Sequence, residues 1–499
     1  MTRKSFPIIV GAAQYTQPKN MLQPLDPLNL MVKTSQMAIS DTTTEELKDY
    51  IDSVFMTNIS SWSYEDAPGE LSKILGINPS KKFYFTPMGN LPQALVNRAA
   101  KAIFSGESQA VLITGGEAAY SSYNAGKGKI TLNWPKPEDP KYMESMMEGT
   151  TEFERNYGLH SAPCAYALFE TAIRASSGRS FEEHRKYMGK LFEHFSKIAA
   201  KNPYAWIQKS YTPDEITIPS AENRNVNYPY TKRMCANFFV DQSGALLMTN
   251  EEIAEKLGIN RKLWIYPMGG ADLKNIQYIT QRQRYNESPA ARFGPKLALE
   301  QAGLSLEDIS QFDIYSCFPS IVQIIRKELG LSEDDPRDLS IAGGLPYFGG
   351  PLSNYSLHAI ITTVSLIRED PSKRIMIIAN GGFNTKQSFG IYGTTPPVKS
   401  WGDNDEKAIQ ETILAETLPE PVEEANGQLT IDAYTIYYER DGMPKRGIVL
   451  GHLENHRNTL AYIDAKPEQL KNLERIDIVG QIFPVHFNSK LNRNLINLD

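Results

Sequence analysis

Cys317 is the residue of this sequence whose position most favours chemistry. It follows an apolar run, 312–316, that predicts a strand, and it precedes a predicted helix over 320–329. A thiol at the end of a strand, facing the first turn of a helix, feels the positive end of the helix dipole. That position predicts a lowered thiol pKa and a role as nucleophile or as acid and base. The alternative is a buried cysteine that only packs as a small apolar side chain.

A second candidate is a glycine-rich segment that precedes a helix. Residues 343–355 contain four glycines, among them Gly349 and Gly350. Glycines let the backbone approach a ligand closely, and the turn before a helix offers N–H donors. Asn354 and His358 are four residues apart, so they share a helix face. The alternative is a glycine-rich connection followed by a surface histidine.

The elements that must position these residues form two similar α/β halves. Short apolar strands alternate with amphipathic helices, which is the pattern of a layered α/β sheet. The predicted strands cover 7–14, 51–58, 82–86 and 109–114 in the first half, and 262–268, 312–316 and 374–379 in the second. Each half ends its last strand in a glycine pair, at Gly115–Gly116 and at Gly381–Gly382. This duplication predicts a core with an approximate two-fold axis and a site between the halves.

The sequence divides into four parts. Residues 1–116 and 262–392 are the two halves of the core. Between them, 117–261 predicts an inserted loop domain that returns to the core, a position that often supplies walls of ligand sites. Its two predicted helices cover 162–176 and 181–200. Residues 393–499 begin as a linker and continue with short alternating strands, which predict a small C-terminal OB-like β domain.

Composition and charge narrow the function classes. The 499 residues carry 52 Lys and Arg against 58 Asp and Glu, so the net charge is −6, whereas a nucleic-acid partner favours a basic face. No apolar run of 18 residues and no secretory leader is recognisable, so we expect a cytoplasmic protein without a membrane partner. Three widely spaced cysteines exclude a disulfide framework and a cysteine zinc site, and we expect no metal.

In these features, residues 6–392 of the chain resemble the thiolase superfamily. The resemblance rests on the duplicated halves, the inserted domain and three motifs. The motifs are D-x-x-x-C-F at 313–318, G-G-x-x-x-x-G-G-P at 343–351 and Ala-Asn-Gly-Gly at 379–382. The family implies a duplicated five-layer α/β/α/β/α core. In the sterol-carrier-protein-linked thiolases, the cysteine of a His-Asp-Cys-Phe motif acts as acid and base, and the resemblance gives that role to Cys317.

The sequence also departs from the thiolase pattern. Met88 lies nearest the position of the nucleophilic cysteine, and Tyr315 replaces the histidine of the His-Asp-Cys-Phe motif. Gly350 stands where the Gly-His-Pro motif has histidine, and Ala379 replaces the late cysteine. A thioether forms no acyl-enzyme, so the resemblance implies binding of coenzyme A or acyl-CoA without ordinary thiolysis. With its extra C-terminal domain, the chain most resembles the thiolase-like proteins of type 1.

The leading hypothesis is an acyltransferase-superfamily enzyme of lipid metabolism, similar to acetyl-CoA acetyltransferase, that acts on acyl-CoA without the usual nucleophile. Cys317 would be the acid and base, with Tyr315 or His358 assisting. Backbone groups of the glycine turns and one amide would bind the CoA thioester and polarise its oxygen. The residues expected at this CoA site are Gly349, Gly350, Asn354, Gly381 and Gly382.

Two other functions stay open. One is a retro-aldolase-type carbon–carbon lyase acting on hydroxyacyl-CoA, in which Tyr315 takes part and the fused β domain replaces the separate OB-fold partner of such lyases. The other is a non-catalytic acyl-CoA-binding scaffold. In each case acyl-CoA is the expected ligand, and no covalently bound cofactor is expected. A homodimer and a monomer are both compatible with the sequence.

Overall fold

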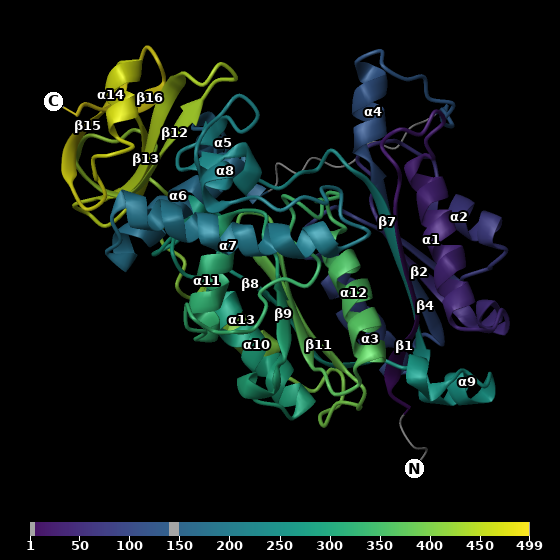
Figure 1. Ribbon diagram of the computed structural model, residues 1–499. Helices are drawn as coiled ribbons and strands as arrows, with labels where there is room; N and C mark the ends of the chain where they lie inside the picture. Colours follow the sequence, from purple (N-terminus) through teal and green to yellow (C-terminus); the bar gives the residue numbers. More distant parts are fainter. Residues whose placement is uncertain (1–4, 139–148, 499) are drawn as a thin grey trace.

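The core of the protein consists of two stacked mixed sheets with helices between and outside them (Figure 1). The computed structural model describes residues 5–138 and 149–498. In the first sheet, hydrogen bonds join the strands in the order β1-β7-β4-β2-β3, with β7 antiparallel to both of its neighbours. These strands are β1 (Pro7–Thr16), β2 (Ile51–Thr57), β3 (Lys81–Phe85), β4 (Ala110–Ala118) and β7 (Asp241–Asn250).

The second sheet repeats this arrangement with one strand fewer among the described residues. Its order is β8-β11-β10-β9, in which β11 is antiparallel to both neighbours. The strands are β8 (Tyr266–Lys274), β9 (Gln311–Ile314), β10 (Ile375–Gly381) and β11 (Lys386–Gly393). Beside β9, the backbone N–H of Ile314 donates to Leu339 O at 2.9 Å, so a short apolar segment lies where the first sheet has β3. The predicted duplication of the core is confirmed.

Three helix layers complete the five-layer core. One layer covers the outer face of the first sheet, a central layer separates the sheets, and a third covers the second sheet. In that order they are α1 (Pro27–Asp41) and α2 (Ala67–Leu75), then α3 (Leu91–Phe104) and α12 (Tyr355–Glu369), then α10 (Pro289–Ala302) and α11 (Pro319–Leu329). Helix α1 begins at the predicted cap, since Asp26 Oδ1 accepts the N–H groups of Leu28 and Asn29.

The inserted segment is mostly helical, and its two long helices are confirmed. Their bounds are α6 (Ala162–Ser177) and α7 (Phe181–Lys201), and Ser180 closes a capping box at the start of α7. The remaining elements are α4 (Ala119–Gly126), α5 (Glu152–Asn156), α8 (Pro213–Thr217), β5 (Asn225–Asn227), β6 (Tyr230–Thr231) and α9 (Glu251–Lys256). Helices α6 and α7 cross above the second half of the core in Figure 1.

The C-terminal part forms a closed β barrel of OB-like topology. Its strands pair in the cyclic order β12-β13-β14-β16-β15-β12, with β14 parallel to β16 and a helix between β14 and β15. The elements are α13 (Glu406–Leu414), β12 (Gly427–Tyr438), β13 (Pro444–Leu453), β14 (Asn458–Ile463), α14 (Pro467–Asn472), β15 (Ile482–Asn488) and β16 (Arg493–Ile496). The expected small OB-like domain is therefore confirmed, and it packs against α6.

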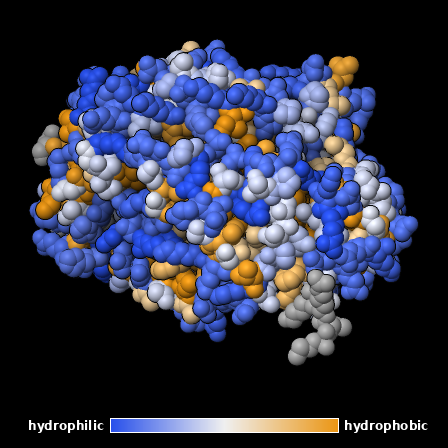
Figure 2. Space-filling view, turned by 60° about the horizontal axis from the view of Figure 1, so that its bottom comes forward, coloured by the Kyte–Doolittle hydropathy of each residue, from blue (hydrophilic) through white to orange (hydrophobic). Residues whose placement is uncertain are grey.

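The surface is largely hydrophilic on the face that Figure 2 shows, and its apolar residues lie in small groups. Within the described residues, no helix combines the length and the apolar character needed to cross a membrane.

Candidate functional site

Four segments meet at one end of the central helix layer: the turn before α3, the loop after β9, the loop before α12 and the turn after β10. The rings of Tyr315 and Tyr355 have centroids 5.7 Å apart, which joins the loop after β9 to the start of α12. Ser356 Oγ donates to Gly89 O at 2.9 Å, which joins α12 to the turn before α3. The N–H of Tyr315 donates to Ile378 O at 2.9 Å, next to β9. The duplicated fold thus brings together segments that are far apart in the sequence.

Cys317 is buried in the loop between β9 and α11. Its thiol lies within hydrogen-bonding reach of the Tyr166 hydroxyl and the Asn380 amide, and the N–H of Phe318 also faces it. Burial raises the pKa of the Cys317 thiol to about 12, and these hydrogen bonds offset only part of the increase. The prediction of a lowered pKa is wrong, because the lost solvation outweighs the dipole of α11. At neutral pH Cys317 therefore keeps its proton.

Tyr166 is a site residue that sequence reasoning missed. Its hydroxyl donates to Gly382 O at 2.9 Å and accepts the Asn380 Nδ2 amide at 2.7 Å and the Asn384 N–H at 3.1 Å. Its ring stacks on Phe318, with centroids 4.8 Å apart. Tyr166 therefore holds the turn after β10 against the Cys317 loop. It lies inside a predicted helix of the inserted segment, and no motif there marks it.

A buried polar network supports Tyr166 from behind. The Tyr230 hydroxyl lies 2.7 Å from Glu170 Oε2, 2.8 Å from Ser320 Oγ and 3.1 Å from the carbonyl oxygen of Tyr166. Glu170 Oε1 also lies 2.7 Å from His184 Nε2. Ser320 belongs to the first turn of α11, so this network fixes α6 relative to the helix that follows the Cys317 loop.

The turn before α3 carries Met88, the residue that we expect nearest the position of the thiolase nucleophile. Met88 packs against the turn after β10, since a Cβ on Gly381 would lie 2.6 Å from Met88 Cγ. A Cβ on the neighbouring Gly89 would lie 2.5 Å from the hydroxyl of Tyr315. Burial raises the pKa of Tyr315, so its phenol is neutral at physiological pH. This hydroxyl forms no hydrogen bond with another residue that the structure describes, which leaves it available to a ligand.

The polar groups at the start of α12 are bound within the protein. Gly350 N–H donates to Asn237 O at 2.8 Å. The Asn354 amide is fully buried: its Nδ2 donates to Pro351 O at 3.1 Å, and its Oδ1 accepts Thr57 Oγ1 at 2.7 Å. These hydrogen bonds fix the loop before α12.

Gly349 in this loop and His358 on α12 are also held in place by contacts within the protein. Gly349 has a φ of +114°, and a Cβ there would lie 2.5 Å from Gln242 Oε1. His358 is fully buried on α12, so the alternative of a surface histidine is wrong. Its Nδ1 lies 2.9 Å from Gln14 Oε1, and burial lowers its pKa to about 3, so the ring is neutral. The partners of His358 lie toward β1 and not in the Cys317 loop.

Comparison with known proteins agrees with this geometry. A family model described as "Thiolase-like protein type 1 additional C-terminal domain" matches residues 408–490, within the part that forms the barrel. The whole chain is similar to a monomeric SCP2-thiolase like protein type 1 from Mycobacterium smegmatis, at 32% identity and a TM-score of 0.86 over 100% of both chains. The chain belongs to the SCP2-thiolase-like proteins of type 1. Its resemblance to the thiolase superfamily is thereby confirmed.

More distant relatives share parts of this type 1 chain. Sterol carrier protein 2 of Bos taurus is 23% identical over 242 residues, which are 45% of this chain and 40% of that protein. The chain spans less than half the length of the curated relatives it matches. The Ltp2-ChsH2(DUF35) aldolase matches with a TM-score of 0.59 at 17% identity, covering 78% of this chain and 97% of that one. That likeness is one of fold.

Proposed function

We propose that this type 1 protein binds a CoA thioester and makes or breaks a carbon–carbon bond beside the thioester, without an acyl-enzyme. The observation that carries the proposal is the neutral Cys317 thiol between Tyr166 and Asn380. Opposite this acid, the position of the thiolase nucleophile holds Met88, a thioether that cannot attack a carbonyl group. The site therefore favours proton transfer over acyl transfer.

Cys317 acts in this proposal on the α-carbon of the thioester. When the bond between the α- and β-carbons breaks, its electron pair passes to the thioester enolate, and Cys317 gives its proton to the α-carbon. The β-hydroxyl gives its proton to water as the bond breaks, and water then returns a proton to the Cys317 thiolate, so the site regains its starting state. Tyr315 donates a hydrogen bond to the thioester oxygen, because its hydroxyl has no acceptor among the described residues and enolate charge gathers on that oxygen.

The glycine turns shape the proposed CoA site. Gly381 and Gly382 bring the turn after β10 against Met88 and Tyr166, and Gly349 and Gly350 fix the loop before α12. Glycines have no side chain that could contact CoA, and the N–H of Gly350 is already bonded to Asn237 O. We therefore assign these four glycines to the walls of the site. Asn354 and His358 likewise position α12, and the assisting role passes to Tyr315.

The test of this proposal is turnover of acyl-CoA, 3-ketoacyl-CoA and 3-hydroxyacyl-CoA esters by the whole chain. Cys317→Ala should lower turnover at least about 10²-fold, the contribution typical of one general acid, while CoA esters still raise the melting temperature. Cys164→Ala is the matched control, because Cys164 is also buried but lies on α6 outside the Cys317 loop. Unchanged turnover in Cys317→Ala would exclude the acid role.

The more specific form of this function that we favour is aldol cleavage of a 3-hydroxyacyl-CoA. The position of the barrel favours it, since β12 packs on the helix that carries Tyr166. The fold is shared with the Ltp2-ChsH2(DUF35) aldolase, and here an OB-like barrel belongs to the same chain. Release of an aldehyde or ketone from 3-hydroxyacyl-CoA supports this function. Lyase activity that survives truncation at about residue 395 would show that the barrel is not needed for this function.

Stabilisation by CoA esters without any turnover would instead support a non-catalytic binder. A cytoplasmic location and a role in lipid metabolism stay predictions, as does the oligomeric state. The monomeric relative from Mycobacterium smegmatis favours a monomer over a homodimer.

A further inference from the structure

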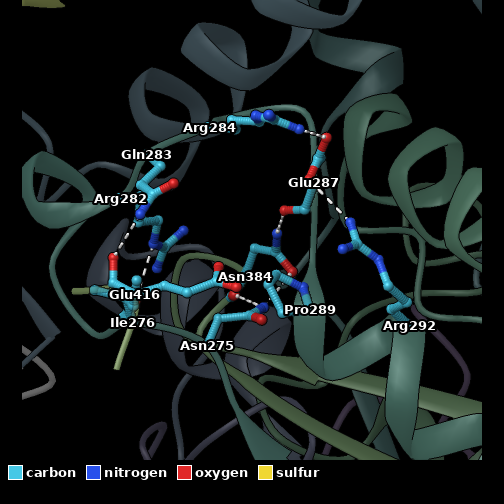
Figure 3. Close-up of a pocket in the computed structure, with 10 residues that line it drawn as sticks. All are labelled: Asn275, Ile276, Arg282, Gln283, Arg284, Glu287, Pro289, Arg292, Asn384 and Glu416. Atoms are coloured by element: carbon cyan, nitrogen blue, oxygen red, sulfur yellow. Dashed lines mark hydrogen bonds and ion pairs between the residues drawn. The ribbon is translucent and has the colours of Figure 1, made fainter. Parts of the chain in front are cut away.

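A cavity apart from the Cys317 loop opens between the core and the linker to the barrel (Figure 3). It measures about 160 Å³. Its walls come from the connection between β8 and α10, the turn after β10, and the linker after α13. The lining residues used below are Arg282, Arg284, Glu287, Arg292, Asn384 and Glu416. Nothing in the proposed proton transfer uses this cavity.

Arg282 is a buried cation at the edge of the cavity, and it has no ion-pair partner within the described residues. Its guanidinium donates to the carbonyl oxygens of Ile276, Gln277 and Phe383 and to Thr385 Oγ1, at 2.7–3.2 Å. These bonds use four of its five N–H groups, which leaves one on Nη1. Burial lowers the pKa of Arg282 to about 10, so it keeps its charge at neutral pH. A buried charge of this kind is stabilised when an opposite charge approaches it.

Two further arginines lie at the rim of the cavity, and both are paired with carboxylates. Arg284 and Arg292 both pair with Glu287 at 2.9 Å, and Arg292 Nε also pairs with Glu328 at 2.7 Å. Figure 3 shows the side chains of Arg284 and Arg292 reaching toward Glu287 from two different sides. With Glu416 counted, three carboxylates accompany the three arginines. Guanidinium groups bind the oxygens of phosphate and carboxylate in pairs, and the fork of Arg suits a tetrahedral phosphate.

We propose that this cavity binds a phosphate group, either as inorganic phosphate or as the phosphate of a small phosphomonoester. Arg282 supplies a fixed donor at the inner edge, and Arg284 and Arg292 supply further donors at the rim. The small, polar cavity suits a compact oxyanion. The pairs with Glu287 and Glu328 use Nη1 of Arg284 and Nε and Nη2 of Arg292, which leaves Nη2 of Arg284 and Nη1 of Arg292 without a partner among the described residues.

The cavity is linked to the Cys317 site through the turn after β10. Arg282 holds Phe383 O and Thr385 Oγ1, and Asn384 between them donates its N–H to the Tyr166 hydroxyl at 3.1 Å. A phosphate that fixes Arg282 also fixes this turn, and with it Tyr166 beside the acid. The cavity is therefore an effector site, and its occupancy does not depend on which reaction Cys317 performs.

Calorimetric titration of the full chain with inorganic phosphate, in a chloride buffer of constant ionic strength, tests the proposal. We expect saturable binding at one site. Arg284→Gln should weaken it at least tenfold, whereas Glu416→Gln should strengthen it, because it removes a negative charge from the wall. Arg261→Gln is the control, since Arg261 is an exposed arginine that pairs with Glu255 outside the cavity. The melting temperatures without phosphate verify that every variant is folded.

Further titrations separate the sources of the ligand. Tighter binding of glycerol 3-phosphate than of inorganic phosphate assigns the site to an organic phosphate, and the reverse assigns it to the free ion. Binding of succinate but not of either phosphate would overturn the proposal. So would the absence of saturation, or equal binding by the wild type, Arg284→Gln and Glu416→Gln.

Discussion

At the scale of single residues, the pKa of Cys317 results from two opposing effects. The start of α11 favours the thiolate, and burial favours the thiol; burial prevails and raises the pKa to about 12. The sequence predicts where Cys317 lies, because a strand and a helix flank it. It does not predict how deeply the loop is covered, nor that Tyr166 reaches it from the inserted domain. Residue identity and local position therefore predict the place of Cys317 in the fold, but not its protonation state.

Replacement of Tyr166 by phenylalanine tests the contact between the inserted domain and the acid. Tyr166→Phe removes the bonds to Gly382, Asn380 and Asn384, so we expect a loss of about 1–3 kcal/mol in stability and at least tenfold in turnover. Tyr392→Phe is the matched control, because this buried hydroxyl bonds Gln93 within the core at 2.7 Å. Tyr392→Phe should lower the stability and leave turnover unchanged. Equal turnover in both variants would place Tyr166 outside the site.

Burial of His358 predicts how the free energy of unfolding depends on pH. Its pKa is about 3 in the folded protein and about 6.5 when unfolded, so the unfolded chain binds more protons between these values. Stability should therefore fall as the pH drops from 6.5 toward 3, with a contribution of up to about 1.4 kcal/mol per pH unit. Urea unfolding at several pH values should show this slope as the difference in stability between the wild type and His358→Gln, and no such difference between the wild type and His160→Gln, whose histidine is exposed. An equal pH dependence in the wild type and in His358→Gln would contradict the assignment.

At the scale of elements, the strands and helices that carry the motifs are well predicted, and the contacts between them are not. Helices α6 and α7 follow their predicted ranges within one residue at each end. Strand β11 is different: its sequence contains glycine, serine and glutamine, and only its place between β8 and β10 makes it a strand. The start of α3 shows the same limit, since Gly89 is required by Tyr315, which lies in the other half of the chain.

A methyl group on Gly89 tests this close approach. In Gly89→Ala the Cβ would lie 2.3 Å from Asn380 O and 2.5 Å from the Tyr315 hydroxyl. We expect a loss of about 1–3 kcal/mol in urea unfolding, together with reduced turnover because Tyr315 must move. Gly126→Ala serves as control: no atom lies within 4 Å of its added methyl group, and its stability should change by less than about 0.5 kcal/mol. Unchanged stability in Gly89→Ala would show that the turn before α3 lies less close to Asn380 and Tyr315 than described.

At the scale of the whole molecule, the barrel is joined to the thiolase core through the inserted domain. Thr171 Oγ1 on α6 donates to Tyr434 O at 2.8 Å and accepts Tyr434 N–H at 3.1 Å. One hydroxyl group on α6 thus bonds both backbone polar groups of Tyr434 in β12. Asn458 Nδ2 donates to the carbonyl oxygens of Thr280 and Arg282, beside the cavity that Arg282 lines. The alternating strands predict an OB-like domain, but they carry no signal for where it docks.

Thr171→Val removes the docking bonds with little change in shape. It leaves the backbone N–H and carbonyl of Tyr434 buried without partners, which should cost about 2 kcal/mol and speed hydrogen exchange in β12. Thr363→Val is the matched control, because Thr363 is also buried and its hydroxyl has no partner within the described residues. That change should be neutral or stabilising. Unchanged exchange in β12 of Thr171→Val would mean that other contacts hold the barrel.

The most direct test of the central claim is one reaction followed by two mass measurements. The whole chain is incubated with 3-hydroxyacyl-CoA and with 3-ketoacyl-CoA, and the released products and the intact protein are weighed at the same time points. We predict cleavage of 3-hydroxyacyl-CoA that depends on Cys317, no cleavage of 3-ketoacyl-CoA, and no acyl group added to the protein at any time. An acylated protein that forms and decays at the rate of turnover would contradict proton-transfer chemistry without an acyl-enzyme.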